Sequence, residues 1–78
     1  MGLYIRIEKA REEPDAVYYS FIKDHEVGVL RITRSGGETT LIAAISSDRD
    51  GGYYARAARK VRQAWERGDL PDVLSWSS

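Results

Sequence analysis

Three short polar breaks divide the first 46 residues into segments that each have the composition of a β-strand. The clearest break is Ser35–Glu38, because its two adjacent glycines can adopt positive φ at low cost. Lys23–Glu26 is a second break of hairpin length, and the charged stretch Lys9–Asp15, which contains Pro14, is predicted to be a loop. Connections this short join neighbouring antiparallel strands. The pattern therefore predicts an antiparallel meander, with strands near residues 3–8, 16–22, 27–34 and 39–46.

The first two of these segments differ in how they are buried. Leu3, Ile5 and Ile7 alternate with polar or aromatic residues, and this period of two predicts a strand with one buried face. Residues 16–22 are apolar at both odd and even positions, so both faces of the segment are apolar. This indicates a strand covered at least in part on both sides.

A single amphipathic helix is predicted near residues 51–67. Asp48 or Asp50 is the expected acceptor for its first amide groups. Gly68 and Pro71 mark its end. The tail 69–78 still carries apolar side chains, so we expect it to dock on the body over the end of the sheet. The predicted helix buries one apolar stripe, which consists of Tyr54, Ala57, Ala58, Val61, Ala64 and Trp65.

These elements predict one α+β domain spanning residues 1–78, since 78 residues leave room for one core. Its architecture is a four-stranded antiparallel β-meander with one C-terminal α-helix packed on one face and an extended C-terminal tail. One helix cannot cover both faces of a four-stranded sheet. The second face is therefore expected to meet water, the tail or a partner.

The composition argues against several kinds of chemistry. The chain has no cysteine and one histidine, His25, which lies in a predicted polar hairpin between two acidic residues. We predict no catalytic residue, no metal site and no cofactor, and the protein is not expected to be an enzyme. Gly51-Gly52 does not match a phosphate-binding loop, because the required lysine does not follow it.

The hydropathy of the chain predicts a protein that does not span a membrane. The longest wholly uncharged apolar run, Leu41–Ile45, is far too short to cross a bilayer. The N-terminal segment lacks the basic start and long apolar stretch of a signal peptide. We therefore expect a cytoplasmic location.

The outer face of the predicted helix is the strongest candidate for a binding surface. Arg56, Lys60 and Arg67 lie within about 40° of one another on a helical wheel, with Arg59 beside them. Residues 53–67 contain five basic side chains and one acidic one. Such a stripe can be an ordinary solvated face, or it can bind an acidic protein or a nucleic acid. A protein partner is favoured over nucleic acid because twelve basic residues balance twelve acidic ones in the whole chain.

Aromatic residues provide the second set of candidate binding positions. Tyr4 and Tyr18 belong to predicted strands, where aromatic rings among arginines are also found in RNA-binding sheets, although core packing or self-association is the preferred interpretation. Trp76 is predicted first to anchor the tail and second to be a hot spot for a partner. The half-covered sheet also makes a homodimer plausible.

Two residue patterns stand out, one in the helix and tail and one in the strands. They are Tyr54-Ala-Arg-Ala57, Val61, Trp65, Gly68, Pro71 and Trp76-Ser-Ser78 in the first, and Tyr18-Tyr-Ser-Phe21 with Gly28, Leu30 and Ile32 in the second. These patterns resemble those of small bacterial β-β-β-β-α proteins of uncharacterised function. The resemblance implies no catalytic residue, and it implies an immunity or interaction role. Together with the basic face, it leads to the prediction of a non-enzymatic protein-interaction module, such as an inhibitor or immunity-like binder, with nucleic-acid binding as the alternative.

Overall fold

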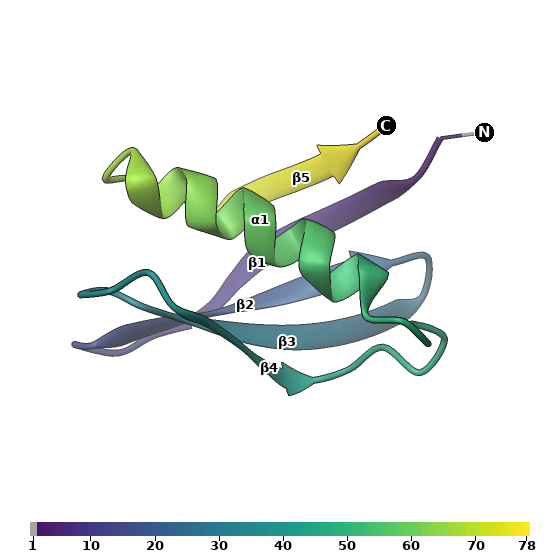
Figure 1. The fold of residues 1–78 in the computed structure, drawn as a ribbon, viewed down its shortest axis with the longest axis horizontal. Coiled ribbons are helices and arrows are strands. Elements are labelled where there is room, and N and C mark those ends of the chain that lie inside the picture. The colour runs from purple at the N-terminus through teal and green to yellow at the C-terminus, as the bar shows by residue number, and fades with distance from the viewer. Residues whose placement is uncertain (1) are drawn as a thin grey trace.

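The computed structural model describes residues 2–78 and contains one antiparallel sheet with one helix on one of its faces (Figure 1). Met1, the first residue of the predicted domain, lies outside the described residues. The α+β class and the antiparallel meander predicted from the sequence are confirmed. The sheet has the strand order β4-β3-β2-β1-β5. The elements are β1 (Tyr4–Glu12), β2 (Ala16–Lys23), β3 (Glu26–Thr33), β4 (Thr39–Ala43), α1 (Gly52–Glu66) and β5 (Val73–Ser77).

The predicted turns lie where the meander reverses. Lys23 pairs with Glu26, so Asp24 and His25 form a two-residue hairpin turn, in which Asp24 adopts a φ of 57°. Gly37 adopts a φ of 65° in the turn between β3 and β4. A small polar residue and a glycine are the residue types that tolerate this left-handed region.

The prediction of a loop over residues 9–15 was too long. The strand β1 continues to Glu12, because Arg11 and Glu12 pair with Tyr18 and Val17 of β2. A register shift between Lys9 and Arg11 accommodates one extra residue, as a β-bulge does. The ladder to β2 thus orders a charged segment that has no strand composition of its own.

The predicted fourth strand was too long at its C-terminal end. The strand β4 ends at Ala43 instead of continuing to residue 46. Two residues later Ile45 is buried, with 2% of its surface exposed, and it packs in the core cluster. The chain leaves the sheet because this large apolar side chain is buried off the end of the strand.

The tail forms a fifth strand, which the predicted count of four did not include. Val73–Ser77 pairs antiparallel with β1, with Leu74 opposite Ile7 and Trp76 opposite Ile5. The tail therefore extends the edge of the sheet and does not lie over its end. From Leu74 to Ser77 the strand alternates apolar and small polar side chains, and the pairing places Leu74 and Trp76 on the same face as the two buried isoleucines.

The core lies between α1 and the sheet face that it covers. The apolar stripe predicted for the helix is confirmed, since Tyr54 and Trp65 are half-buried and the other members are buried. The sheet contributes the large side chains, among them Tyr19 and Phe21. The buried core residues are Ile5, Ile7, Ala16, Val17, Tyr19, Phe21, Leu30, Ile32, Ile45, Ala57, Ala58, Val61 and Ala64.

The N-cap residue of α1 is Gly51, which has a φ of 74° and no side-chain cap, so neither Asp48 nor Asp50 occupies the N-cap position that the sequence suggested. The first amides of the helix nevertheless donate hydrogen bonds to these two residues. The Asp48 carboxylate accepts hydrogen bonds from the amides of Tyr53 and Tyr54, each at 3.0 Å. At the other end, Gly68 has a φ of 78°, and the amide of Asp69 donates to the carbonyl of Ala64 at 3.0 Å. This closure is a Schellman motif. It turns the chain back toward β5.

Candidate functional site

The unpaired positive charge of the described chain is concentrated on α1 and the loop before it. Among residues 2–78, seven of the twelve basic side chains form ion pairs, and five do not. Every arginine and lysine of the sheet and its turns is paired. The five cations without an acidic partner in the described part of the chain are Arg49, Arg56, Arg59, Lys60 and Arg67. Four of these are the basic residues that the sequence predicted to bind a partner.

The fold brings three of the predicted binding residues together where α1 passes beside β5. Arg56, Arg59 and Trp76 line an open cleft of about 450 Å³ together with Gly52 and Ala55. Among the residues that the structure describes, no acidic side chain lines this cleft. Trp76 reaches it because it faces the helix side of the edge strand. The sequence alone does not reveal this contact, since Arg56 and Trp76 are twenty positions apart.

The Arg56 guanidinium is held in place by two contacts. Its carbon Cζ lies 5.2 Å from the centroid of the Trp76 ring, within the range of a cation–π interaction. Its Nη1 donates a hydrogen bond to the carbonyl of Gly52 at 3.0 Å. A guanidinium has five N–H donors in a fixed fork. The remaining donors are available to a carboxylate or phosphate at the half-buried position of Arg56.

Lys60 and Arg67 extend the basic surface along the helix, away from Trp76. Lys60 is half-buried one turn after Arg56, while Arg67 is exposed and caps the C-terminal end of α1. Arg56 and Arg67 are separated by about three turns, or roughly 16 Å. The predicted stripe is therefore long enough to meet an extended surface and too long for one small anion. We call Arg56, Arg59, Lys60 and Arg67, with Trp76, the basic face.

The structure separates the two predicted tyrosines from the basic face. Tyr4 and Tyr18 lie on the sheet face that α1 does not cover, which we call the open face. Tyr4 is 54% exposed. The guanidinium of Arg11 lies 4.3 Å from the centroid of the Tyr18 ring. The predicted binding residues thus belong to two surfaces on opposite sides of the sheet.

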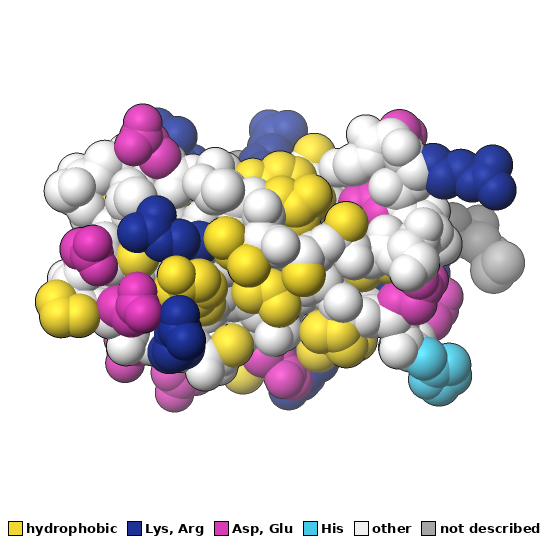
Figure 2. All heavy atoms as spheres, turned by 90° about the horizontal axis from the view of Figure 1, so that it is seen from below, with side chains coloured by type: hydrophobic (Ala, Val, Ile, Leu, Met, Phe, Trp, Pro, Cys, Tyr) yellow, Lys and Arg dark blue, Asp and Glu magenta, His cyan; other side chains and the backbone are white. Residues whose placement is uncertain are grey.

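The open face carries an apolar band between charged margins. Figure 2, which looks onto this face, shows hydrophobic side chains gathered along its middle and acidic and basic ones toward its ends. Val27 and Ile42 are each about half exposed, and they lie beside the half-buried Ile22 and Val29. We define the apolar band as Tyr18, Ile22, Val27, Val29 and Ile42.

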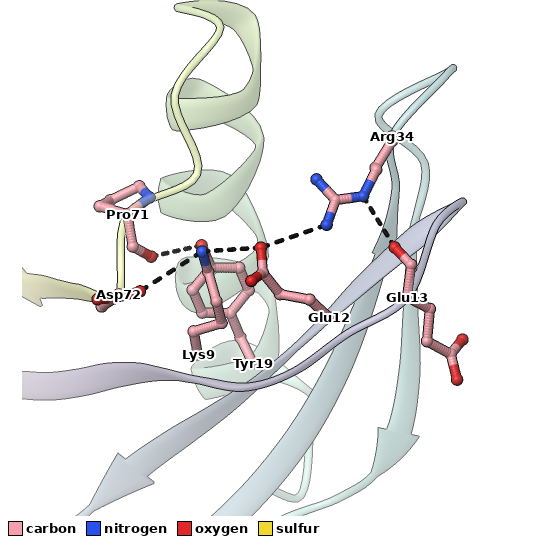
Figure 3. A network of polar contacts seen from close by, with 7 residues as sticks. All are labelled: Lys9, Glu12, Glu13, Tyr19, Arg34, Pro71 and Asp72. Carbon is pink, nitrogen blue, oxygen red and sulfur yellow. Dashed lines mark hydrogen bonds and ion pairs between the residues drawn. The ribbon is translucent and has the colours of Figure 1, made fainter.

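A polar network at one end of the molecule was not predicted from the sequence (Figure 3). The Glu12 carboxylate accepts a hydrogen bond from Lys9 Nζ at 3.2 Å and one from Arg34 Nη2 at 3.3 Å. These two bonds hold the pKa of Glu12 below its usual value, chiefly through Lys9. Lys9 also pairs with Asp72 at 3.5 Å. The network joins β1 to the end of β3 and to the segment that precedes β5.

Tyr19 contributes a buried contact to the same region. Its hydroxyl donates a hydrogen bond to the carbonyl of Pro71 at 2.6 Å. Burial raises the pKa of Tyr19 to about 12, and the nearby carboxylates of Asp69 and Asp72 act in the same direction. These contacts attach the segment after α1 to the sheet. Their partners lie far apart in sequence, so no local pattern indicates them.

His25 is exposed at the tip of the hairpin between β2 and β3. Across residues 2–78, no group of three or more His, Asp or Glu side chains is arranged to hold a metal ion. The one described helix also lacks the length and apolar character of a transmembrane span.

The fold and its surfaces define an α+β domain in which one helix covers one face of a five-stranded antiparallel sheet. No protein-family model, curated protein or solved structure matches the chain.

Proposed function

We propose that this protein is a non-enzymatic interaction module that binds an acidic surface of a partner protein through its basic face. The observation that carries the proposal is the distribution of ion pairs. The cations of the sheet have acidic partners within the described chain, whereas Arg56, Arg59, Lys60 and Arg67 have none. An acidic partner would supply the missing counter-charges.

The cleft at Arg56 is the expected centre of this contact. Trp76 and Arg56 belong to residue types, tryptophan and arginine, that are enriched among the positions that dominate binding energy at protein interfaces. Arg56 already rests on the Trp76 ring and on the Gly52 carbonyl. Less side-chain entropy is then lost when a carboxylate binds, which favours affinity.

An inhibitor or immunity-like role is one use of such a surface, and the resemblance of the helix and tail supports it. Many enzymes place carboxylates in their active sites, and a basic helix face complements such a site in charge. Under this role the protein binds the acidic site and blocks it.

Nucleic-acid binding is the alternative, because phosphates complement the same cations. The net charge of zero argues against it, as do Asp48, Asp50 and Glu66 near the two ends of the helix. The two functions differ in salt dependence. Binding of several phosphates releases condensed counterions and makes log K fall steeply with log salt concentration.

The test titrates the protein with two probes, an acidic peptide that contains aromatic residues and short mixed-sequence oligonucleotides. Tryptophan fluorescence reports binding, since Trp76 lines the cleft. Arg56→Ala with Arg59→Ala removes the cations of the cleft. Arg62→Ala is the matched control, because Arg62 also lies over a tryptophan, at 5.5 Å from Trp65, but pairs with Glu66 at 3.7 Å.

The proposal predicts that the acidic peptide binds at low salt, that the double variant loses this binding and that the control retains it. Tighter binding of oligonucleotides with a steep salt slope would establish the alternative. If neither probe binds at low salt, or if the control weakens binding as much as the double variant, the basic face is not a binding surface.

A further inference from the structure

The apolar band of the open face is continuous across three strands. Ile22 of β2 lies directly opposite Val27 of β3. Val29 follows on the same side of β3 and pairs with Ala43 of β4, next to Ile42. Tyr18, Val29 and Ile42 also line a shallow hollow of about 380 Å³ with Ala10 and Arg11. Apolar side chains that lie together on an exposed sheet are typical of a contact surface.

The charges that border this band neutralise one another. Arg6 pairs with Glu8, Arg11 pairs with Glu13 at 3.1 Å, and Arg31 approaches Asp15 at 4.0 Å. A partner of strong net charge would therefore gain no binding free energy from the charges of the open face, in contrast to those of the basic face. The open face matches a partner surface that is apolar in the middle and has balanced charges at its margins.

We propose that two copies of this chain pack through their open faces as a twofold-symmetric dimer. A twofold interface joins the same patch of both subunits, so the patch must be complementary to itself. A neutral face with an apolar centre meets this condition, because the apolar band can pack on its own copy and the bordering arginines already have acidic partners.

The size of the face also suits a dimer. It extends along the 35 Å and 19 Å axes of the chain. This area is comparable with the roughly 800 Å² that each partner of a standard-size interface buries. The two sheets would pack about 10 Å apart, as in a β-sandwich.

This arrangement has a consequence for the basic face. Since α1 lies on the opposite side of each sheet, the dimer has four layers in the order helix, sheet, sheet, helix (Figure 1). Both basic faces then point outward, in opposite directions. The dimer does not depend on the proposed function, but it would make any binding through the basic face bivalent.

A dimer formed by pairing of edge strands has a different geometry from one formed by packing of the open faces, and substitutions can distinguish the two. The edge strand β4 has no charged residue, so two copies of it could also pair along their backbones. Val27 lies on the inner strand β3 and faces only the open face. Leu41 lies on β4 and faces the helix side, beside Leu30. A lysine at Val27 opposes face packing, and a lysine at Leu41 opposes edge pairing.

The experiment measures molecular mass by sedimentation equilibrium over a wide range of protein concentration. The wild type is compared with Val27→Lys, Ile42→Lys and the control Leu41→Lys. All three positions are partly exposed, at 54%, 51% and 39%, so the variants are expected to fold, which circular dichroism checks. The thermal unfolding midpoint of the wild type, measured against concentration, gives a readout that needs no variant, since dimerisation makes it rise with concentration.

The proposal predicts a species of twice the 8.8 kDa chain mass and a thermal unfolding midpoint that rises with concentration. Val27→Lys and Ile42→Lys should each weaken dimerisation about tenfold or more, because each places two charges in an apolar interface. Leu41→Lys should leave it within about twofold of the wild type, as surface substitutions usually do. A wild type that stays at 8.8 kDa at every concentration, or a dimer that Leu41→Lys dissociates and Val27→Lys does not, overturns the proposal.

Discussion

The indole ring of Trp65 lies so close to Gly37 that no other residue fits there without a shift. A Cβ atom built on Gly37 would come within 2.5 Å of the ring carbon Cε3. The ring nitrogen of Trp65 also donates a hydrogen bond to the carbonyl of Arg34 at 2.8 Å. The last turn of α1 is thereby attached to the turn between β3 and β4.

This contact predicts that Gly37→Ala destabilises the protein by about 2–4 kcal/mol. About 1–2 kcal/mol comes from the positive φ of 65°, and about 1–2 kcal/mol more from overpacking against the ring. Gly51→Ala is the control, because Gly51 has a similar φ of 74° but no atom within 4 Å of its Cβ position. Urea unfolding measures both variants. If the two variants lose the same free energy of unfolding, the contact between Gly37 and Trp65 is not tight.

Tyr19 is expected to make stability sensitive to alkaline pH. Tyr19→Phe removes the hydrogen bond to Pro71 and should cost about 1–2 kcal/mol at neutral pH. The pKa of Tyr19 is raised from 10.0 to about 12, so its contribution is complete below pH 10.0 and is lost as the pH rises through about 12. The difference in stability between the wild type and the variant should therefore shrink over this interval. Tyr18→Phe, on the open face, is the control for the general effect of alkaline pH, and a difference that does not change with pH would contradict the prediction.

Glu12 is expected to contribute to stability at neutral pH and not in acid. Lys9 and Arg34 hold the pKa of Glu12 below its usual value of 4.5. Its contribution is therefore present above pH 4.5 and is lost as the pH falls through the lower pKa of the folded state. Glu12→Gln should be less stable than the wild type at pH 7 and equally stable in strong acid, as measured by chemical unfolding across this range. Glu38→Gln is the control, because Glu38 forms no ion pair among residues 2–78. A deficit of Glu12→Gln that persists unchanged in acid would contradict the assignment.

Asp48 is expected to stabilise the start of α1 more than Asp50 does. Asp48→Ala removes two hydrogen bonds to helix amides and should cost about 1–2 kcal/mol. Asp50→Ala removes one, to the amide of Gly52, and should cost about half as much. In a chain of this size, 1 kcal/mol corresponds to a shift of about 4–8 °C in the thermal midpoint. If Asp50→Ala has the larger effect, Asp48 is not the principal acceptor.

The candidate site was predicted in part. The sequence shows which residues could bind a partner, but it does not show which of them lie next to one another in space. Arg56, Arg59, Lys60 and Arg67 form one surface because helical periodicity relates them. Trp76 joins Arg56 only because β5 pairs with β1 on the side of the sheet where α1 crosses. Alternation along β1 and the register between β1 and β2 place Tyr4 and Tyr18 on the opposite side. No spacing along the chain carries this information.

Local sequence patterns were sufficient to predict the four strands of the meander apart from the ends of β1 and β4, the turns between them, and the apolar stripe and approximate extent of α1. These features follow from side-chain periodicity and from residues with special backbone freedom, such as Gly37 and Gly68, which act over a few neighbouring positions. Three features became visible only in the folded chain: residues 73–77 form an edge strand, β1 continues to Glu12, and Lys9, Arg34 and Asp72 meet around the Glu12 carboxylate. Each of these depends on pairing between segments far apart in the chain. Such pairing is selected by which apolar faces can be buried together, and this is a property of the whole assembled sheet.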